Sequence, residues 1–146
     1  MRIQFLALLA ACAVAVPVAA QSQAIDQGNK TAKLILTYTG EIQPGQEQAF
    51  RQAAAKIAAG VEKEPGTQVY YWSMRADGKT FDVVEIYKDS AAFLAHVKDV
   101  RSNFADELKT QKGTKLVVYG DPDAEAKKAI EGLHPEYESP FAGFIH

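Results

Sequence analysis

The sequence predicts one α+β domain in which four strands and two helices follow one another in the order βαββαβ. Two stretches carry apolar residues three or four positions apart, which is the spacing of an amphipathic helix. Four shorter stretches are rich in β-branched and aromatic residues, and two of them flank an Asp-Gly pair typical of a hairpin turn. Together these patterns predict an antiparallel sheet with helices packed on one face.

The first strand and the first helix are predicted between residues 33 and 66. The segment KLILTYT, residues 33–39, has the composition of a strand, and Pro44 in the turn that follows suits the start of a helix. A helix of about 18 residues is expected there because its apolar residues form one stripe, namely Phe50, Ala54, Ile57 and Val61. The segment EPG, residues 64–66, ends this helix.

The next two strands, residues 67–75 and 80–88, are predicted to form a hairpin. Asp77-Gly78 in the connecting ADGK is a favoured pair for a tight two-residue turn, because both residues tolerate positive φ. That turn sets the register, with Met74 opposite Phe81, Trp72 opposite Val83 and Tyr70 opposite Glu85. Both faces of the hairpin are then substantially apolar, so both must be covered, and one layer of helices covers only one of them.

The second helix and the fourth strand complete the domain. Asp89 or Ser90 is a suitable cap for the helix. The apolar stripe that follows is Phe93, Val97, Val100, Phe104 and Leu108. Gly113 is expected to end the helix, and KLVVY, residues 115–119, to form the strand. This order predicts the ferredoxin-like split plan, an antiparallel sheet with two helices on one face.

The first twenty residues have the pattern of a secretory signal peptide. Arg2 gives a positive start, residues 3–18 are nearly all apolar, and small residues precede the polar segment after Ala20. We therefore expect cleavage after Ala20, a periplasmic or secreted protein with no stable membrane insertion, and a disordered leader over residues 21–31. The alternative is a lipoprotein anchored through Cys12, because residues 9–12 read LAAC, although the apolar run continues past that cysteine.

Composition excludes several classes of function. Cys12 is the only cysteine in the 146 residues, so cleavage would leave a chain without disulfides, thiol catalysis or thiolate metal sites. The formal net charge is −2 with acids and bases well mixed, and no basic patch indicates a nucleic-acid partner. By length, the chain that remains after cleavage is one domain, and its βαββαβ unit is expected over residues 32–120.

Residues 121–146 are predicted to form a C-terminal helix, from about Asp123 to Glu131, and an aromatic arm. The arm is too apolar for a free tail, so we expect it to dock on its own subunit or on a partner; its apolar residues are Tyr137, Phe141, Phe144 and Ile145. His134 and His146 also lie in this segment. They lack a third ligand, so no metal site is expected from them.

Three motifs carry a resemblance to a known family. They are EPGT (64–67) before the second strand, FDVVEIY (81–87) in the third, and DSAAFLAH (89–96) opening the second helix. Their order and spacing resemble the antibiotic biosynthesis monooxygenase family of dimeric α+β barrels, which includes small quinol monooxygenases. The resemblance spans about residues 34–120. It implies a homodimer that buries the second sheet face, on which Val69, Tyr71, Val84 and Ile86 lie.

The resemblance also implies a pocket between the helices and the sheet of each subunit. Its substrate-binding residues would be Tyr70, Trp72 and Tyr87, whose rings have polar tips suited to a small aromatic or quinol ligand. His96 would project from the second helix as a catalytic proton acceptor or donor, and Glu85 would face the same pocket by register.

Each of these residues also has a plain structural interpretation. His96 could be a helix-edge residue satisfied by a local hydrogen bond. Glu85 could be paired with an arginine, for which Arg51 and Arg75 are available. The rings of Tyr70 and Trp72 could be ordinary core. The sequence leaves these alternatives open.

Monooxygenases of this family are described as needing no metal, flavin or haem, so the resemblance implies no cofactor. An electron-rich quinol, once deprotonated, can pass an electron to oxygen itself. The haem-degrading branch needs an asparagine on the first strand and a histidine late in the second helix. Here the first strand offers Tyr38 and Thr39, and residues 103–106 read NFAD, which argues against haem.

The leading hypothesis from the sequence is therefore an exported, cofactor-independent monooxygenase that oxidises quinols or related small phenolic compounds with molecular oxygen. The alternative is a non-catalytic small-molecule-binding or stress-associated dimer on the same scaffold, because a fold does not fix a function. An isomerase or lactone-type enzyme on a related barrel is a third hypothesis.

Overall fold

The computed structural model describes residues 33–142. The expected signal peptide (1–20), the leader (21–31) and the end of the arm (143–146) lie outside these described residues, so the expectations placed on them stay predictions. Within the described range, no helix is both long enough and apolar enough to span a membrane.

All six elements predicted for the domain are present, in the predicted order. Their bounds are β1 Leu34–Ile42, α1 Glu47–Val61, β2 Thr67–Met74, β3 Thr80–Tyr87, α2 Ser90–Asn103 and β4 Gln111–Tyr119. Four shorter elements complete the described chain: the 3-10 helix η2 Glu107–Thr110, the helix α3 Ala124–Ile130, the 3-10 helix η3 Glu131–Leu133 and the strand β5 Glu136–Glu138. The predicted α+β class with a ferredoxin-like order is confirmed.

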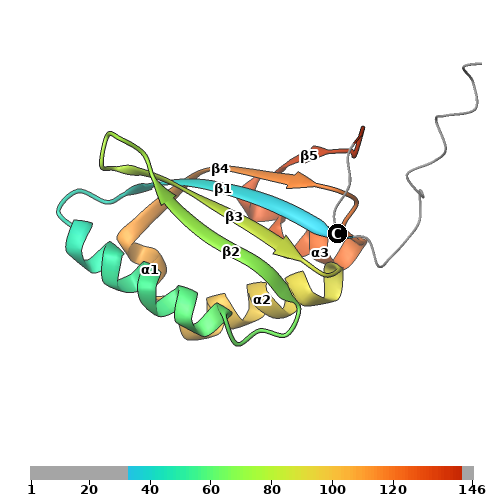
Figure 1. Ribbon diagram of the computed structural model, residues 1–146, viewed down its shortest axis with the longest axis horizontal. Coiled ribbons are helices and arrows are strands. Elements are labelled where there is room, and N and C mark those ends of the chain that lie inside the picture. The colour runs from blue at the N-terminus through green and yellow to red at the C-terminus, as the bar shows by residue number, and fades with distance from the viewer. Residues whose placement is uncertain (1–32, 143–146) are drawn as a thin grey trace, which may run out of the picture.

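The strands form one sheet in the order β2-β3-β1-β4-β5. The four long strands pair antiparallel as predicted, whereas the additional strand β5 lies parallel to β4, so the sheet is mixed. Figure 1 shows α1 and α2 together beneath the sheet. The short helix α3 packs on the same side, since its Ala126 and Ile130 share a buried cluster with Leu36 of β1.

The apolar stripe of α1 faces the sheet. Phe50, Ile57 and Val61 are buried as the spacing predicts, but Ala53 is buried more deeply than Ala54. On the sheet, every second residue of β3 from Phe81 to Tyr87 is buried, which is the period of a strand with one face covered. This alternation turns Glu85 toward the helices together with its apolar neighbours.

The hairpin register is confirmed, with Met74 opposite Phe81, Trp72 opposite Val83 and Tyr70 opposite Glu85. The turn itself differs from the predicted two-residue turn, because only Gly78 has a positive φ, at 69°. The last hydrogen bond of the hairpin joins the Arg75 amide to the Thr80 carbonyl, which leaves four residues in the loop. The Asp77 carboxylate closes that loop by accepting from the Thr80 amide at 2.8 Å and the Thr80 hydroxyl at 2.6 Å.

The second helix is shorter than predicted. It ends at Asn103 rather than continuing through Leu108, and η2 follows separately. The physical reason is the position of Phe104, which leaves the helical path with φ −129° and packs its ring on α1 beside Ile57 and Val61. Gly60 makes room for that ring, since a Cβ atom there would lie 2.5 Å from it.

The fourth strand begins earlier than predicted, at Gln111 rather than Lys115. Gly113, expected to end the second helix, instead lies within β4. A Cβ atom at this glycine would lie 2.5 Å from the Tyr38 hydroxyl, so the glycine leaves space for the Tyr38 ring. That hydroxyl donates a hydrogen bond to Gln111 Oε1 at 2.8 Å.

The C-terminal segment docks on its own subunit through backbone pairing more than through its aromatic residues. Asp123 caps α3 by accepting from the Ala126 amide at 2.8 Å, close to the predicted start of this helix. The strand β5 pairs with β4, and Lys115 bonds Glu136 at 2.9 Å across that pair. The expected docking of the aromatic residues is not seen for Phe141, which is 96% exposed.

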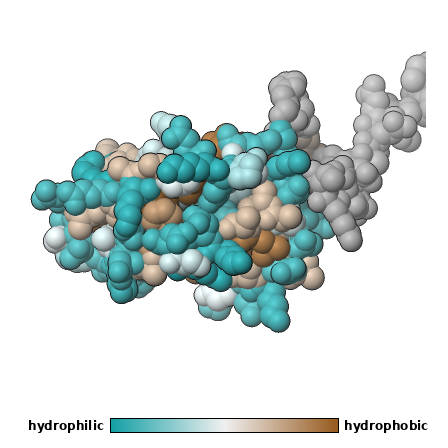
Figure 2. Space-filling view, turned by 90° about the horizontal axis from the view of Figure 1, so that it is seen from below, coloured by the Kyte–Doolittle hydropathy of each residue, from teal (hydrophilic) through white to brown (hydrophobic). Residues whose placement is uncertain are grey.

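The two outer surfaces of the molecule differ in polarity. Figure 2, seen from the side of α1 and α2, is mostly hydrophilic with small apolar areas between the charged side chains. On the opposite face of the sheet, Tyr71 is 65% exposed and Val69 is 36% exposed. This sheet face is therefore the uncovered apolar surface that the sequence predicted.

Gly40→Ala is expected to destabilise the protein by about 1–3 kcal/mol, the usual cost of overpacking a core. A Cβ atom at Gly40 of β1 would lie 2.5 Å from the ring of Phe81, so one of them must move. The matched control is Gly132→Ala, because no atom lies within 4 Å of its Cβ position. That control should change the free energy of unfolding by less than about 0.5 kcal/mol. Equal urea midpoints for the two variants would contradict this packing.

Candidate functional site

Four of the five predicted site residues converge between α2 and the sheet. Glu85 and Tyr87 lie on the helix-facing side of β3, and Tyr70 lies opposite Glu85 on β2. His96 comes down onto them from α2, one turn after the buried Phe93. Asp89 fixes the start of α2 at Ser90, because its side chain accepts a hydrogen bond from the Ala92 amide at 2.8 Å. This start places His96 on the turn of α2 that faces the sheet.

Glu85 is a buried carboxyl group with one tyrosine partner. The Tyr87 hydroxyl donates to Glu85 Oε2 at 2.6 Å, and Glu85 and Tyr87 are 9% and 0% exposed. Burial raises the pKa of Glu85 above its ordinary value, and the electrostatic interaction with His96 and the Tyr87 hydrogen bond oppose the rise only in part. Burial, followed by the charge of Glu85, raises the pKa of the Tyr87 hydroxyl well above its ordinary value.

His96 is held by a second carboxylate, Glu64, in the loop between α1 and β2. The Nδ1 atom of His96 lies 3.0 Å and 3.2 Å from the two carboxylate oxygens, and the side chains of His96 and Glu64 are 7% and 15% exposed. The Thr67 hydroxyl donates to the same carboxylate at 2.5 Å. Glu64 is the functional candidate that sequence reasoning missed. Its position in the EPGT motif was the available signal.

A row of rings connects this cluster with the far end of the hairpin. The ring centroid of His96 lies 5.2 Å from that of Tyr87 and 5.3 Å from that of Tyr70. Tyr70 meets Trp72 edge to face at 5.9 Å, and Trp72 stacks on Phe81 at 5.3 Å. Burial, then the charges of Glu85 and Glu64, raises the pKa of the Tyr70 hydroxyl far above its usual range, so this hydroxyl remains a hydrogen-bond donor.

An open groove lies at the Trp72 end of this row, between α1 and the hairpin. Its volume is about 270 Å³, and its lining includes Phe50, Arg51, Ala54, Trp72, Met74 and Phe81. The buried Nε1 atom of Trp72 has no hydrogen-bond partner among the described residues. It lies close enough to the Tyr70 hydroxyl to oppose the rise of its pKa, but the two atoms do not form a hydrogen bond of good geometry. The groove is therefore lined by aromatic rings and by the cationic Arg51, and the indole N–H of Trp72 is a donor without an acceptor within residues 33–142.

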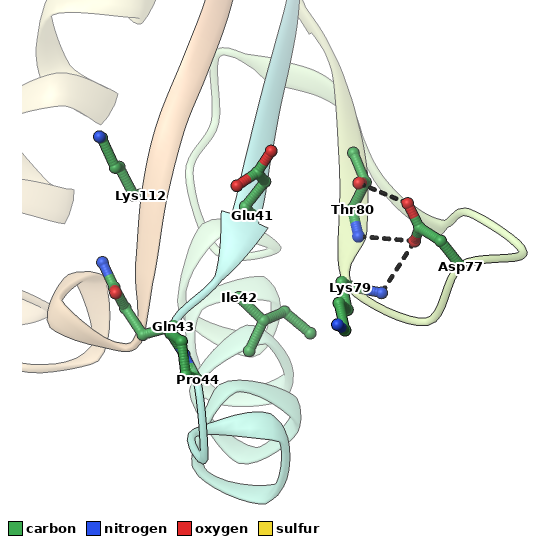
Figure 3. Close-up of a pocket in the computed structure, with 8 residues that line it drawn as sticks. All are labelled: Glu41, Ile42, Gln43, Pro44, Asp77, Lys79, Thr80 and Lys112. Carbon is green, nitrogen blue, oxygen red and sulfur yellow. Dashed lines mark hydrogen bonds between the residues drawn. The ribbon is translucent and has the colours of Figure 1, made fainter.

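A second depression, shown in Figure 3, lies at the C-terminal end of β1, where Glu41 and Ile42 line it, and has a volume of about 350 Å³. Glu41, Lys79 and Lys112 surround it with the hairpin loop. The Asp77 carboxylate, which lines this depression, already accepts hydrogen bonds from Thr80 and from the Lys79 amide. These hydrogen bonds lower the pKa of Asp77 to about 2. None of the predicted site residues lines it.

The structure thus brings Tyr70, Glu85, Tyr87 and His96 together and places Trp72 next to them at the groove. Glu85, Tyr87 and His96 are all buried and line neither depression described above, so the cluster is closed rather than open. The proposed arginine partner of Glu85 is not found. Arg75 instead bonds Asp82 at 2.8 Å and 2.9 Å on the other face of the sheet.

Within residues 33–142 no group of three or more His, Cys, Asp or Glu side chains is arranged to hold a metal ion. His134 has a left-handed backbone conformation with φ 50° after η3. His146, with which the sequence could have paired it, lies outside the described residues.

Glu85→Gln is expected to gain stability relative to the wild type as pH rises. The folded-state pKa of Glu85 lies above 4.5, its unperturbed value, so losing its proton costs more in the folded chain than in the unfolded one. The wild type loses that contribution as pH rises from 4.5 through the raised pKa, while glutamine loses nothing. Urea unfolding of both proteins from about pH 4 to pH 8 measures the difference. Glu41→Gln, an exposed position on β1, is the control; a Glu85→Gln difference that stays constant would contradict the expectation.

Part of the chain is similar in sequence to a known protein family. Residues 34–101 match the sequence profile of the family described as antibiotic biosynthesis monooxygenase. None of the curated protein sequences matches the chain.

Solved structures share the fold at low sequence identity. MupZ from Pseudomonas fluorescens has a TM-score of 0.69 at 17% identity, with 78% of this chain and 94% of that chain covered. A variant of SnoaB, a cofactor-independent oxygenase from Streptomyces nogalater, has a TM-score of 0.53 at 12% identity over 63% of this chain and 95% of that chain. The structure of a protein described as an antibiotic biosynthesis monooxygenase has a TM-score of 0.54 at 17% identity, with 62% of this chain and 99% of that chain covered.

These solved structures share the fold of this chain, and the sequence profile identifies the family. The profile covers β1 through nearly all of α2, which are the elements that position Glu64, Tyr70, Glu85, Tyr87 and His96. Residues 34–101 of this chain therefore form a domain of the antibiotic biosynthesis monooxygenase family.

Proposed function

We propose that the protein is an exported monooxygenase that oxidises quinols or related small phenolic compounds with molecular oxygen and needs no metal or flavin. The family of residues 34–101 supports the reaction class, and the fold is shared with a cofactor-independent oxygenase. The single observation that carries the proposal is the buried His96, bonded at Nδ1 to Glu64 and packed against the rings of Tyr70 and Tyr87.

The cluster has the parts that deprotonation of a quinol requires. A histidine held by a carboxylate through one nitrogen can accept a proton at the other. Little water reaches His96, which is 5% exposed, so a quinolate formed beside it would stay reactive toward oxygen. Burial raises the pKa of Glu85 above its ordinary value, which makes its carboxylate a stronger proton acceptor than an exposed one, so Glu85 is a second group able to exchange a proton with the substrate.

The chemistry balances without another reactant. The quinol hydroxyl gives its proton to His96, and the anion supplies electrons to molecular oxygen. One oxygen atom enters the ring, and the other leaves as water with two of the hydrogens of the substrate. The ring is oxidised to a hydroxyquinone, and His96 returns its proton to the departing oxygen.

The groove at Trp72 is the place where a flat ring would enter. Phe50 and Trp72 present aromatic surface there, and Arg51 lies at the rim. The ring row leads from this groove through Tyr70 to His96, so the side chains of Tyr70 and Trp72 must shift for a ligand to reach the cluster. In this proposal Tyr70, Trp72 and Tyr87 pack on the ligand faces and bond its oxygens.

One observation favours the alternative, a binding protein without turnover. Tyr87 is fully buried, and the carboxyl groups of Glu85 and Glu64 already have partners within the protein. A cluster satisfied in this way could be a structural tie, and the groove alone could hold a small aromatic molecule. Oxygen consumption separates the two functions, because only the enzyme consumes oxygen.

The sheet face opposite the helices is proposed to pair with a second copy of the chain. Tyr71 and Val69 expose apolar surface on the edge strand β2, and the half-buried Val84 lies opposite Tyr71 on β3. Uncovered apolar area of this kind favours association. A homodimer through this face agrees with the dimeric barrels that the family resemblance implies.

His96→Ala and Glu85→Gln are both expected to lower quinol-dependent oxygen uptake by roughly 10²–10⁴-fold, the usual value of a proton-transfer group. An oxygen electrode with a panel of hydroquinones measures the uptake, without added metal or flavin. The matched control for the helix is Lys98→Ala, which is exposed on α2 and should keep wild-type activity.

Stability must be measured on the same samples, because both residues are buried. Folded variants with unchanged oxygen uptake would remove His96 and Glu85 from the mechanism. A wild type that binds a hydroquinone, seen as a raised melting temperature, but consumes no oxygen would establish the binding protein instead.

Val84→Glu is expected to break the dimer, because an unpaired charge buried in an interface costs about 3–5 kcal/mol. Sedimentation velocity should show the wild type as a dimer and the variant as a monomer. Gln52→Glu adds the same charge to an exposed position on α1 and should leave the dimer intact. A Val84→Glu protein that sediments as a stable dimer would place the interface elsewhere.

A further inference from the structure

Glu64 reaches His96 because the loop before β2 packs unusually close to α2. A Cβ atom at Gly66 would lie 2.3 Å from the Cβ atom of Ala92, so only glycine allows this approach. Ala92 precedes His96 by one helical turn on the same face of α2. The Lys88 amide also donates to the Gly66 carbonyl at 2.9 Å, which ties the loop to the end of β3. The close approach therefore places the Glu64 carboxylate at the imidazole.

The carboxylate is fixed within its own turn as well. The Glu64 amide donates to the Val61 carbonyl at 2.9 Å, which holds its backbone on the last turn of α1. The Thr67 hydroxyl donates to Glu64 Oε2 at 2.5 Å from the first residue of β2. A side chain anchored at both ends of a short loop has few other positions, so its contact with His96 is preorganised.

The contact determines which nitrogen of His96 carries the proton. An ionised carboxylate only accepts hydrogen bonds, so Nδ1 must be the donor in the neutral imidazole. The other nitrogen, Nε2, then has a free electron pair. Among the described residues, no hydrogen bond to Nε2 is found, and the rings of Tyr70 and Tyr87 pack against the imidazole with centroids 5.3 Å and 5.2 Å away.

We propose that Glu64 is a positioning residue for His96, which it holds with the proton on Nδ1 so that Nε2 accepts the proton of the substrate hydroxyl. This inference rests on the proposed oxygenase function. In the step concerned, the substrate O–H bond breaks, its electron pair stays on oxygen, and an Nε2–H bond forms. The imidazole becomes a cation, and the adjacent Glu64 carboxylate stabilises that charge as it forms.

A structural role alone would have different consequences. The groups that face His96 are Glu64 from the loop, Tyr70 from β2, and Glu85 and Tyr87 from β3. If Glu64 only joined the loop to α2, its removal would lower the melting temperature and leave the turnover of the folded enzyme unchanged. A positioning role predicts a lower kcat with a nearly unchanged KM.

The test compares Glu64→Ala, Glu64→Gln and the matched control Glu62→Gln, which removes an exposed carboxylate two residues earlier. Nitrogen-15 NMR of the imidazoles identifies the protonated nitrogen of His96, with His96→Ala used for assignment. The wild type and Glu64→Gln should show Nδ1–H, because the amide oxygen of glutamine can still accept. Glu64→Ala should show a mixture with Nε2–H. The control should match the wild type.

Oxygen uptake on the same proteins gives the second readout. Glu64→Ala should lower kcat by about 10–100-fold, as loss of an orienting partner usually does, with KM changed less than about threefold. Glu64→Gln should recover part of that loss. An unchanged kcat in a folded Glu64→Ala protein would overturn the inference.

The NMR readout needs no substrate, so it separates the two proposals. A wild type that shows Nδ1–H but consumes no oxygen would overturn the oxygenase function, and with it the positioning role in catalysis. A wild-type His96 that carries its proton on Nε2 would overturn the inference even if the protein consumes oxygen.

Discussion

The burial of one ionisable group, the carboxyl of Glu85, is the constraint on which the helix-facing side of the sheet depends. The hairpin register places Glu85 among apolar residues under α2, where it cannot reach water. A carboxyl group in that position needs a polar partner or a proton. Tyr87 supplies the hydrogen bond, burial raises the pKa, and the nearby His96 limits that rise. These three responses together give the cluster its chemistry.

The same cluster is costly as structure and suited to proton transfer. A purely apolar core would stabilise the fold more simply, because buried carboxyl and imidazole groups contribute little once their desolvation is counted. The geometry resembles an acid–base site instead, since one carboxylate, Glu64, is bonded to a histidine and burial raises the pKa of a second carboxyl group, Glu85. Groups whose pKa is shifted in this way are more frequent in functional sites than in ordinary cores.

Close approaches of the backbone position the site as much as the side chains do. Gly66 lets the loop before β2 touch α2, and Gly60 lets the ring of Phe104 pack on the last turn of α1. The contact at Gly66 brings Glu64 to His96. The contact at Gly60 accompanies the end of α2 at Asn103, and β4 then begins at Gln111, earlier than the sequence predicted. The C-terminal strand β5 then extends the sheet beyond β4, away from the site.

The sequence by itself determined the element order and the hairpin register, because these follow from local periodicity and from the Asp-Gly pair in the hairpin loop. The convergence of Glu85, Tyr87 and His96 was expected from the family resemblance that the sequence motifs carry. Only the tertiary structure decided where α2 ends, that β5 joins the sheet, and that Glu64 holds His96. Those features depend on contacts between segments far apart in the chain, such as Gly66 with Ala92, and local patterns do not report such distances. The tertiary structure also decided that the cluster is closed. Its side chains are tightly packed by neighbours from several elements, and residue spacing along the chain does not predict such packing.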